Sequence, residues 1–244
     1  MNDALGLDGR YVRTMKHVWD SAHNDQRPAI LEWIARCRPA GKLLDIGPGD
    51  AYYMATVQPS SCVLVEPNVV LRGIAKSHCA SLCIDVRVYS SVAQYLQEAL
   101  PRPSCDLVLM IHVLFYMTHE EIEQLLLAIG GRRLAMVHPT LEDSVTVEFE
   151  ESIGLNDCRN RVAQKHRLLG MPTTRASSRS HFRMPLSATD EDLAFLVAHP
   201  TLHGPHWQKR LDAALMFVRE RRPRWVRSDY LELPQAQVLE TYKF

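Results

Sequence analysis

A glycine turn after a short apolar segment is the feature of this sequence that most directly predicts ligand binding. Residues 43–46 read as a buried strand, and Gly47-Pro48-Gly49 follows them at once. Glycines there let a ligand approach the backbone, and the next helix directs its amide dipoles at that ligand. A dinucleotide fingerprint requires a third glycine where Tyr52 stands. Asp45 inside the strand suits a ligand with an ammonium group. The alternative interpretation of the Gly-Pro-Gly turn is a plain connector without a ligand.

Polar side chains also follow the second and third expected strands. Glu66 comes directly after the apolar residues 63–65. A carboxylate at a strand end can accept two hydrogen bonds from the hydroxyls of a ribose, and the alternative is a solvated glutamate. Ser90 and Ser91 are placed either to meet an adenine or to cap the following helix.

An imidazole and two aromatic rings follow the fourth expected strand. His112 comes directly after Ile111, at the strand edge that faces the ligand crevice of a parallel sheet. An imidazole there can accept a proton from an attacking amine or hydroxyl, whereas the alternative is a partly buried histidine bonded to backbone. Phe115 and Tyr116 are candidates for a pocket wall or for the core. Tyr11 either closes over a ligand or packs its own helix.

Alternating strands and helices must position these residues. Strands are expected at 43–46, 62–66, 83–88, 106–111, 134–138 and 236–244, and helices at 51–57, 69–78, 91–100, 119–129, 157–169, 189–199 and 207–221. This order predicts an α/β fold, a Rossmann-like doubly wound and mostly parallel sheet. Two amphipathic helices within residues 9–37 predict an N-terminal helical cap.

The chain is expected to form a single domain, 1–244. Its parts are a cap or lid (1–40), a cofactor-binding half (42–138), and substrate-side helices with the final strands (139–244). Within the last part, an acidic stretch at 141–153 precedes a basic stretch at 159–183. These opposite charges either pair across the surface or offer a docking site for an anion.

Composition excludes several classes of protein. The 244 residues are 46% hydrophobic and 23% charged, and 28 basic residues balance 28 acidic ones. Such a chain is globular, and its zero net charge disfavours nucleic acid and membrane surfaces as partners. The longest apolar run, 107–117, is too short to cross a bilayer, and no signal peptide is expected. Six cysteines without a Cys-x-x-Cys pair indicate reduced thiols in a cytoplasmic protein, and no metal site is predicted.

The glycine turn, Glu66 and Tyr89-Ser90-Ser91, in this order, resemble the class I S-adenosylmethionine-dependent methyltransferases over about residues 42–138. The resemblance implies a sheet of seven strands with the last one antiparallel. It also implies that Asp45 and Gly47 flank the methionine part of S-adenosyl-L-methionine, and that Glu66 holds its ribose. The cofactor residues expected on this basis are Asp45, Gly47, Gly49, Glu66, Ser90, Ser91 and Ile111. Ala51 stands where many members have a third glycine.

Four further segments are similar to the histamine N-methyltransferase family. They are Gly9-Arg10-Tyr11-Val12, Ser21-Ala22-His23-Asn24-Asp25-Gln26, Ile111-His112-Val113-Leu114-Phe115-Tyr116-Met117 and Pro234-Gln235. The similarity implies a cap that closes over cofactor and substrate. Substrate contacts are expected from Tyr11, Asp25, Phe115, Tyr116 and Gln235, with His112 as the catalytic residue. The family's cap carboxylate falls near His23, Asn24 or Asp25, of which only Asp25 is acidic, so a small substrate other than histamine is predicted.

These observations predict an enzyme that transfers a methyl group from S-adenosyl-L-methionine to a nitrogen or oxygen of a small molecule, as in specialised metabolism. Displacement of a methyl group from a sulfonium requires positioning, exclusion of water and at most one proton acceptor, so no metal or catalytic triad is needed. One alternative is a methyltransferase for a peptide or other macromolecule, docked at residues 159–183. Another is a cofactor-binding protein of the same fold without catalysis.

Overall fold

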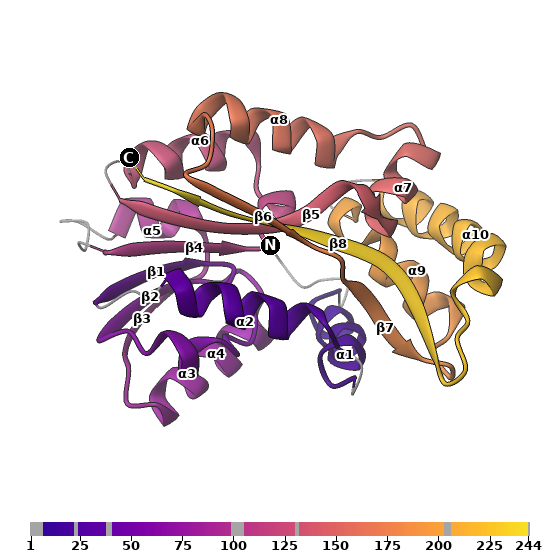
Figure 1. Cartoon of the computed structure of the whole chain (residues 1–244), viewed down its shortest axis with the longest axis horizontal. Helices are drawn as coiled ribbons and strands as arrows, with labels where there is room; N and C mark the ends of the chain where they lie inside the picture. The colour runs from indigo at the N-terminus through magenta and orange to yellow at the C-terminus, as the bar shows by residue number, and fades with distance from the viewer. Residues whose placement is uncertain are drawn as a thin grey trace.

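Within the residues that the structure describes (7–21, 24–37, 41–98, 105–129, 132–202 and 206–243), eight strands form the central sheet of this computed structural model (Figure 1). They are β1 (Lys42–Ile46), β2 (Ser61–Val65), β3 (Asp85–Tyr89), β4 (Leu107–Ile111), β5 (Arg133–Ser144), β6 (Thr174–Ser178), β7 (His181–Pro185) and β8 (Tyr230–Tyr242). The order is β3-β2-β1-β4-β5-β8-β6, and β7 pairs with the first part of β8. β1 to β5 are parallel, and β8 is antiparallel to β5, β6 and β7.

Helices cover both faces of this sheet (Figure 1). They are α1 (Leu7–Trp19), α2 (Gln26–Cys37), α3 (Met54–Val57), α4 (Val69–Ser81), α5 (Val92–Glu98), α6 (His119–Ala128), α7 (Val145–Ser152), α8 (Asp157–Leu169), α9 (Asp190–Ala198) and α10 (Trp207–Trp225), with 3-10 turns η1 (Leu114–Tyr116) and η2 (His199–Thr201). α2, α3 and α4 pack on one face, and α5, α6 and α8 on the other. The predicted Rossmann-like, mostly parallel sheet with N-terminal helices is therefore confirmed, but the sheet has eight strands in the described residues rather than the seven expected.

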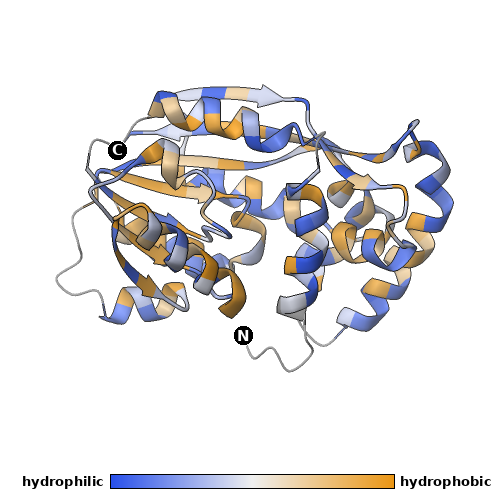
Figure 2. Cartoon of the chain, turned by 90° about the horizontal axis from the view of Figure 1, so that it is seen from below, coloured by the Kyte–Doolittle hydropathy of each residue, from blue (hydrophilic) through white to orange (hydrophobic). Residues whose placement is uncertain are grey.

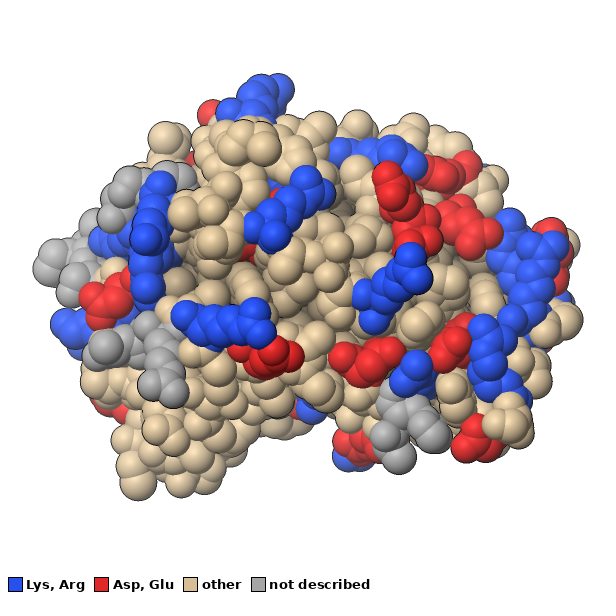
Figure 3. Space-filling view, viewed as in Figure 1, with Lys and Arg blue, Asp and Glu red and all other residues tan. Residues whose placement is uncertain are grey.

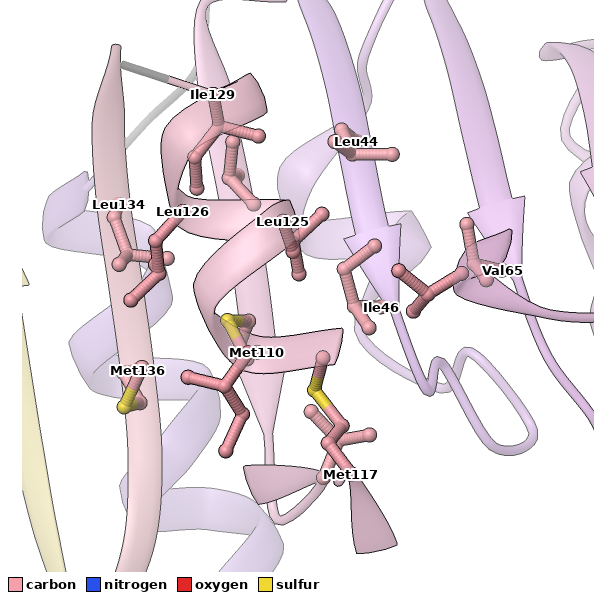
Figure 4. Close-up of a cluster of buried hydrophobic side chains, with 14 of the residues drawn as sticks. Leu44, Ile46, Val65, Met110, Met117, Leu125, Leu126, Ile129, Leu134 and Met136 are labelled. Atoms are coloured by element: carbon pink, nitrogen blue, oxygen red, sulfur yellow. The ribbon is translucent and has the colours of Figure 1, made fainter. Parts of the chain in front are cut away.

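The core consists of the apolar side chains that the strands direct to the two faces. Leu44 and Ile46 of β1 meet Leu125 of α6 on one face (Figure 4), whereas Leu43 packs with Ile34 of α2 on the other. Figure 2 shows the central strands as largely hydrophobic and the helices as mixed, with polar faces turned outward. Because both faces are covered, the central strands β1, β2 and β4 are mostly apolar, whereas the edge strand β3 alternates between polar and apolar residues.

A second apolar cluster lies beyond the carboxyl ends of the parallel strands. It joins α1, α7, α9 and α10 to β7 and the first part of β8, with Phe149, Phe195 and Trp225 buried at its centre. α9 starts at a capping box in which Thr189 and Asp192 exchange side-chain and backbone hydrogen bonds, which fixes where this helix begins. The cluster holds the cap helix α1 and helix α9 opposite the strand ends.

Several elements differ from the expected boundaries. The acidic stretch contains the end of β5 and the helix α7. The basic stretch contains most of α8, all of β6 and part of β7. The sequence did not predict α7, β6 or β7. β6 is exposed over most of its length, so its sequence carries no strong apolar alternation. The helix expected at 51–57 begins only at Met54, and the last strand begins at Tyr230.

Some expectations fall on residues outside the described ranges. These are the first six residues and residues 38–40 of the expected cap, Ala22 and His23, residues 99–100 of the helix expected at 91–100, and Phe244 at the end of the expected last strand.

No helix in the described part of the chain is long and apolar enough to cross a membrane. Lys and Arg alternate with Asp and Glu on the face shown in Figure 3.

Candidate active site

A cavity of about 230 Å³ lies where the carboxyl ends of β1, β2 and β4 meet the cap helices and α9. This is the edge at which open parallel sheets bind their ligands. The predicted site residues that line it are Tyr11, Gly47, Gly49, Glu66, Ile111, His112, Phe115, Tyr116 and Gln235. Asp25, Asp45, Ser90 and Ser91 do not line it. The structure thus brings together residues from both halves of the chain at one cavity.

The turn after β1 is shaped so that only glycine fits at its first position. Gly47 has a φ of +68°, and a Cβ there would lie 2.6 Å from a methyl carbon of Val113. Its N–H donates to the carbonyl oxygen of Val65 at 2.9 Å, which ties the turn to β2. Ala51, at the position of the missing third glycine, is fully buried and also has a positive φ, 55°. Backbone strain at this residue is therefore part of the loop's structure.

Glu66 connects the turn after β1 to the helix after β2. One carboxylate oxygen accepts the N–H of Gly49 at 3.0 Å, and the other accepts the N–H of Asn68 at 2.9 Å. Asn68 in turn caps α4 by accepting from Val70 and Leu71. Glu66 is 5% exposed and lies on the cavity wall. A buried carboxylate held by two backbone donors is a preorganised acceptor for ligand hydroxyl groups.

Asp45 lies beneath the turn rather than in the cavity wall. The hydroxyl of Tyr53 donates to its Oδ2 at 2.5 Å, while Oδ1 has no hydrogen-bond partner among the described residues. Burial raises the pKa of Asp45 to about 8, although the bond from Tyr53 opposes this shift. The carboxyl group is therefore largely protonated at neutral pH, which lowers the cost of burying it away from the cavity.

Ser90, Ser91 and Asp25 have partners outside the cavity. The N–H and hydroxyl of Ser90 donate to the side-chain oxygen of Gln94 at 2.7 and 2.8 Å, and Ser91 accepts the N–H of Gln94 at 3.0 Å. These bonds cap the start of α5, which is the alternative considered for both serines. Asp25 accepts the N–H of His181 at 3.0 Å and pairs with Arg183 at 3.2 Å, so it joins the cap to β7.

His112 is held at the cavity by both its backbone and its ring. It has a φ of 55°, which is rare for a non-glycine residue, and its N–H donates to the carbonyl oxygen of Val137 at 2.8 Å. Its Nε2 lies 3.1 Å from Oε1 of Gln237 on β8. Burial lowers the pKa of His112 to about 4, against the opposing effect of the Gln237 bond. The ring is thus a neutral imidazole at physiological pH.

Aromatic side chains line one side of the cavity. Tyr11 of α1 stacks on the ring of His199, with centroids 4.1 Å apart, and His199 Nδ1 lies 2.9 Å from the hydroxyl of Tyr116. A further hydrogen bond joins Tyr11 to Tyr116. Burial raises the pKa values of both phenols above their usual range, so they remain neutral donors and acceptors. His199 was not predicted, because its helix lies far along the chain from every motif.

Arg27 is a second cavity residue that the sequence did not reveal. It pairs with Asp50 of the glycine turn at 2.5 Å, and its guanidinium lies 4.2 Å from the ring centre of Tyr52 and 4.8 Å from that of Trp19. The cap helix α2 is thereby attached to the loop that follows β1. At the sequence level, Arg27 is only a basic residue before Pro28, and nothing marks it as a contact of the glycine turn.

Comparisons with known proteins show the fold. No protein-family profile and no curated protein matches this sequence. The structure is similar to a putative methyltransferase from Bacillus halodurans (TM-score 0.55, 10% identity, 88% of this chain and 97% of that one). It is also similar to S-adenosylmethionine-dependent methyltransferases from Thiobacillus denitrificans (TM-score 0.53, 14% identity, 96% and 98%) and Geobacter sulfurreducens (0.51, 13%, 95% and 98%), both in complex with S-adenosyl-L-homocysteine. The chain has the Rossmann-like methyltransferase fold.

Proposed function

We propose that this protein is an S-adenosylmethionine-dependent methyltransferase that acts on a nitrogen or oxygen atom of a small molecule. The observation that carries the proposal is the joint placement, in one cavity, of the constrained turn after β1, the buried carboxylate of Glu66 and the neutral imidazole of His112. The turn and carboxylate suit a nucleoside ligand, whereas the imidazole and aromatic rings suit its reaction partner. The likeness to methyltransferase folds supports this assignment.

The residues present fit the cofactor in two respects. Gly47 and Gly49 place backbone at the cavity wall, and Glu66 can exchange its bond with Gly49 for ribose hydroxyl groups. When bound, S-adenosyl-L-methionine would supply a methyl group on a sulfonium sulfur, and a nucleophile that attacks the methyl carbon would displace the sulfur as a neutral thioether.

The protein's own contribution to the reaction is to position the substrate, exclude water and accept a proton. Tyr11 and Trp19 of α1, together with Phe195 of α9, line the cavity with aromatic surface. His112 faces the same space as a neutral base, because its lowered pKa keeps the ring unprotonated. The cavity volume of about 230 Å³ supports a small molecule rather than a macromolecule as the substrate.

A transfer assay with methyl-labelled cofactor tests this function. The panel contains phenols, aromatic amines, aliphatic amines, carboxylic acids and basic peptides, and each compound is tested with and without enzyme. We expect label transfer to at least one small phenol or amine and none to the peptides. Tight cofactor binding without transfer to any compound, or transfer to peptides alone, would contradict the proposal of a small-molecule methyltransferase.

A further inference from the structure

A chain of buried hydrogen bonds lies behind His112. Nε2 of His112 is 3.1 Å from the side-chain oxygen of Gln237, and the amide nitrogen of Gln237 is 2.8 Å from the hydroxyl of Ser180. The hydroxyl of Ser180 is in turn 2.6 Å from the main-chain oxygen of Gln235. Gln237 and Ser180 are 0% and 2% exposed. The chain therefore runs from the cavity wall to a backbone carbonyl without contact with solvent.

The backbone end of this chain fixes the direction of every bond in it. A carbonyl oxygen only accepts, so the single hydroxyl proton of Ser180 goes to Gln235. Ser180 must then accept from Gln237, which requires the NH₂ group of the amide on that side and its oxygen on the side of His112. An amide oxygen only accepts, so Nε2 of His112 must carry the proton. This assignment follows from the network and not from placement of hydrogen atoms.

We propose that Ser180 and Gln237 are positioning residues that hold His112 in the tautomer protonated at Nε2, and that Nδ1 is the atom that accepts the substrate proton. Within the described part of the chain, Nδ1 of His112 makes no hydrogen bond, and the ring lines the cavity. A neutral histidine has one donor and one acceptor nitrogen, so fixing the donor at Nε2 leaves the lone pair on Nδ1.

The proton-transfer step rests on the proposed function. The bond between the substrate nitrogen or oxygen and its hydrogen breaks, and the hydrogen moves to Nδ1 as a proton. The same substrate atom forms the new bond to the methyl carbon, while the carbon–sulfur bond breaks and its electron pair stays on sulfur. The positive charge that leaves the sulfonium ends on the imidazolium of His112, beside the oxygen of Gln237.

Ring nitrogen NMR of the protein alone tests the tautomer. A two-bond proton–nitrogen spectrum of nitrogen-15-labelled protein at pH 7, assigned with His112→Gln, should show His112 protonated at Nε2. Ser180→Ala frees the Gln237 amide to rotate, and Gln237→Met removes the acceptor, so both should populate the Nδ1-protonated form. Ser144→Ala is the matched control, because this buried hydroxyl donates to the Gln235 side chain and does not touch Gln237. A wild-type ring protonated at Nδ1, or a ring unchanged in both variants, would overturn the inference.

Kinetics then test whether this tautomer matters for transfer. Ser180→Ala and Gln237→Met should lower kcat on the order of 10-fold, with cofactor affinity unchanged, because only part of the enzyme then has the acceptor nitrogen free. An unchanged kcat in variants whose tautomer has shifted would exclude Nδ1 as the proton acceptor. The NMR spectrum requires no cofactor or substrate. A failure to bind S-adenosyl-L-homocysteine would therefore refute the proposed function without affecting the test of the His112 tautomer.

Discussion

At the scale of single residues, His112 combines two constraints that folding alone does not require. Its backbone has a positive φ, and its ring is bonded to a neighbouring strand. Non-glycine residues in this region carry backbone strain of about 1–3 kcal/mol, and such strain is concentrated at functional sites. With this backbone conformation, His112 lines the cavity.

Replacement of His112 by glutamine should separate catalysis from stability. We expect kcat to fall roughly 100-fold or more, because glutamine cannot accept the substrate proton. Cofactor affinity should change little, since the turn after β1 and Glu66 are untouched. Steady-state kinetics, calorimetry and melting temperature are measured on the same preparation. A lower melting temperature with a normal rate per folded molecule would instead support a purely structural histidine.

Asp45 leads to a prediction about stability and pH. Its pKa is raised by burial to about 8 in the folded protein, whereas an unfolded aspartate ionises near pH 3.9. The unfolded chain therefore binds fewer protons between these values, and the free energy of unfolding decreases as pH rises through that range. Asp45→Asn imitates the protonated carboxyl and removes this loss. Its gain in melting temperature over wild type should be larger at pH 8 than at pH 5, and an equal difference at both would contradict the raised pKa.

At the scale of elements, strong local patterns in the sequence predict several of the observed site residues. The turn at Gly47, Glu66 and His112 all come directly after buried, mostly apolar strands, and all line the cavity. Ser90 was open to two interpretations, and its observed bonds to Gln94 are those of a helix cap. A local pattern cannot distinguish these roles, because both place a small polar side chain after a strand.

The sequence could not predict which residues of distant elements contact each other. Asp25 pairs with Arg183 on β7, a strand that the sequence did not predict, and so a cap carboxylate is used for attachment rather than for lining the cavity. Gln237 reaches His112 only because β8 lies next to β5 in the sheet. Such pairings depend on sheet order, which no local periodicity records.

The attachment of the cap through Arg27 predicts a specific defect in dynamics. Arg27→Lys keeps the charge opposite Asp50 but loses the planar group that stacks on Tyr52 and Trp19. With S-adenosyl-L-homocysteine present, amide hydrogen exchange in α1 and α2 should be faster in Arg27→Lys than in wild type. Arg36→Lys on the same helix is the matched control, because its pair with Glu32 is exposed. Equal exchange in both variants would exclude Arg27 as the residue that holds the cap.

At the scale of the whole molecule, the charges around the cavity restrict its substrate. Of the described residues that line it, those with acidic or basic side chains other than histidine are Arg27, Asp50 and Glu66. Arg27 and Asp50 neutralise each other, and Glu66 is engaged at the end of β2. The substrate side therefore contains aromatic rings and neutral polar groups, which cannot compensate for a buried ionic group.

This environment predicts a preference for uncharged aromatic substrates. A phenol should have a kcat/KM at least about 10-fold higher than the same phenol carrying an aminomethyl or carboxymethyl group, since an unpaired buried charge costs more than about 1.4 kcal/mol. The comparison is made on matched pairs in the transfer assay, at one pH and ionic strength. A higher kcat/KM for the charged member of each pair would show that the cavity contains a counter-charge we have not assigned.

We infer that the turn after β1 and Glu66 together form a site for S-adenosyl-L-methionine and its demethylated product. Isothermal calorimetry with S-adenosyl-L-homocysteine tests it most directly, on wild type, Glu66→Gln and the exposed control Glu120→Gln, with melting temperatures to verify folding. We expect binding by wild type and the control, and affinity weaker by about 30-fold or more in Glu66→Gln, which corresponds to about 2 kcal/mol for a lost charge-assisted bond. No binding by wild type, or undiminished binding by Glu66→Gln, would contradict the claim.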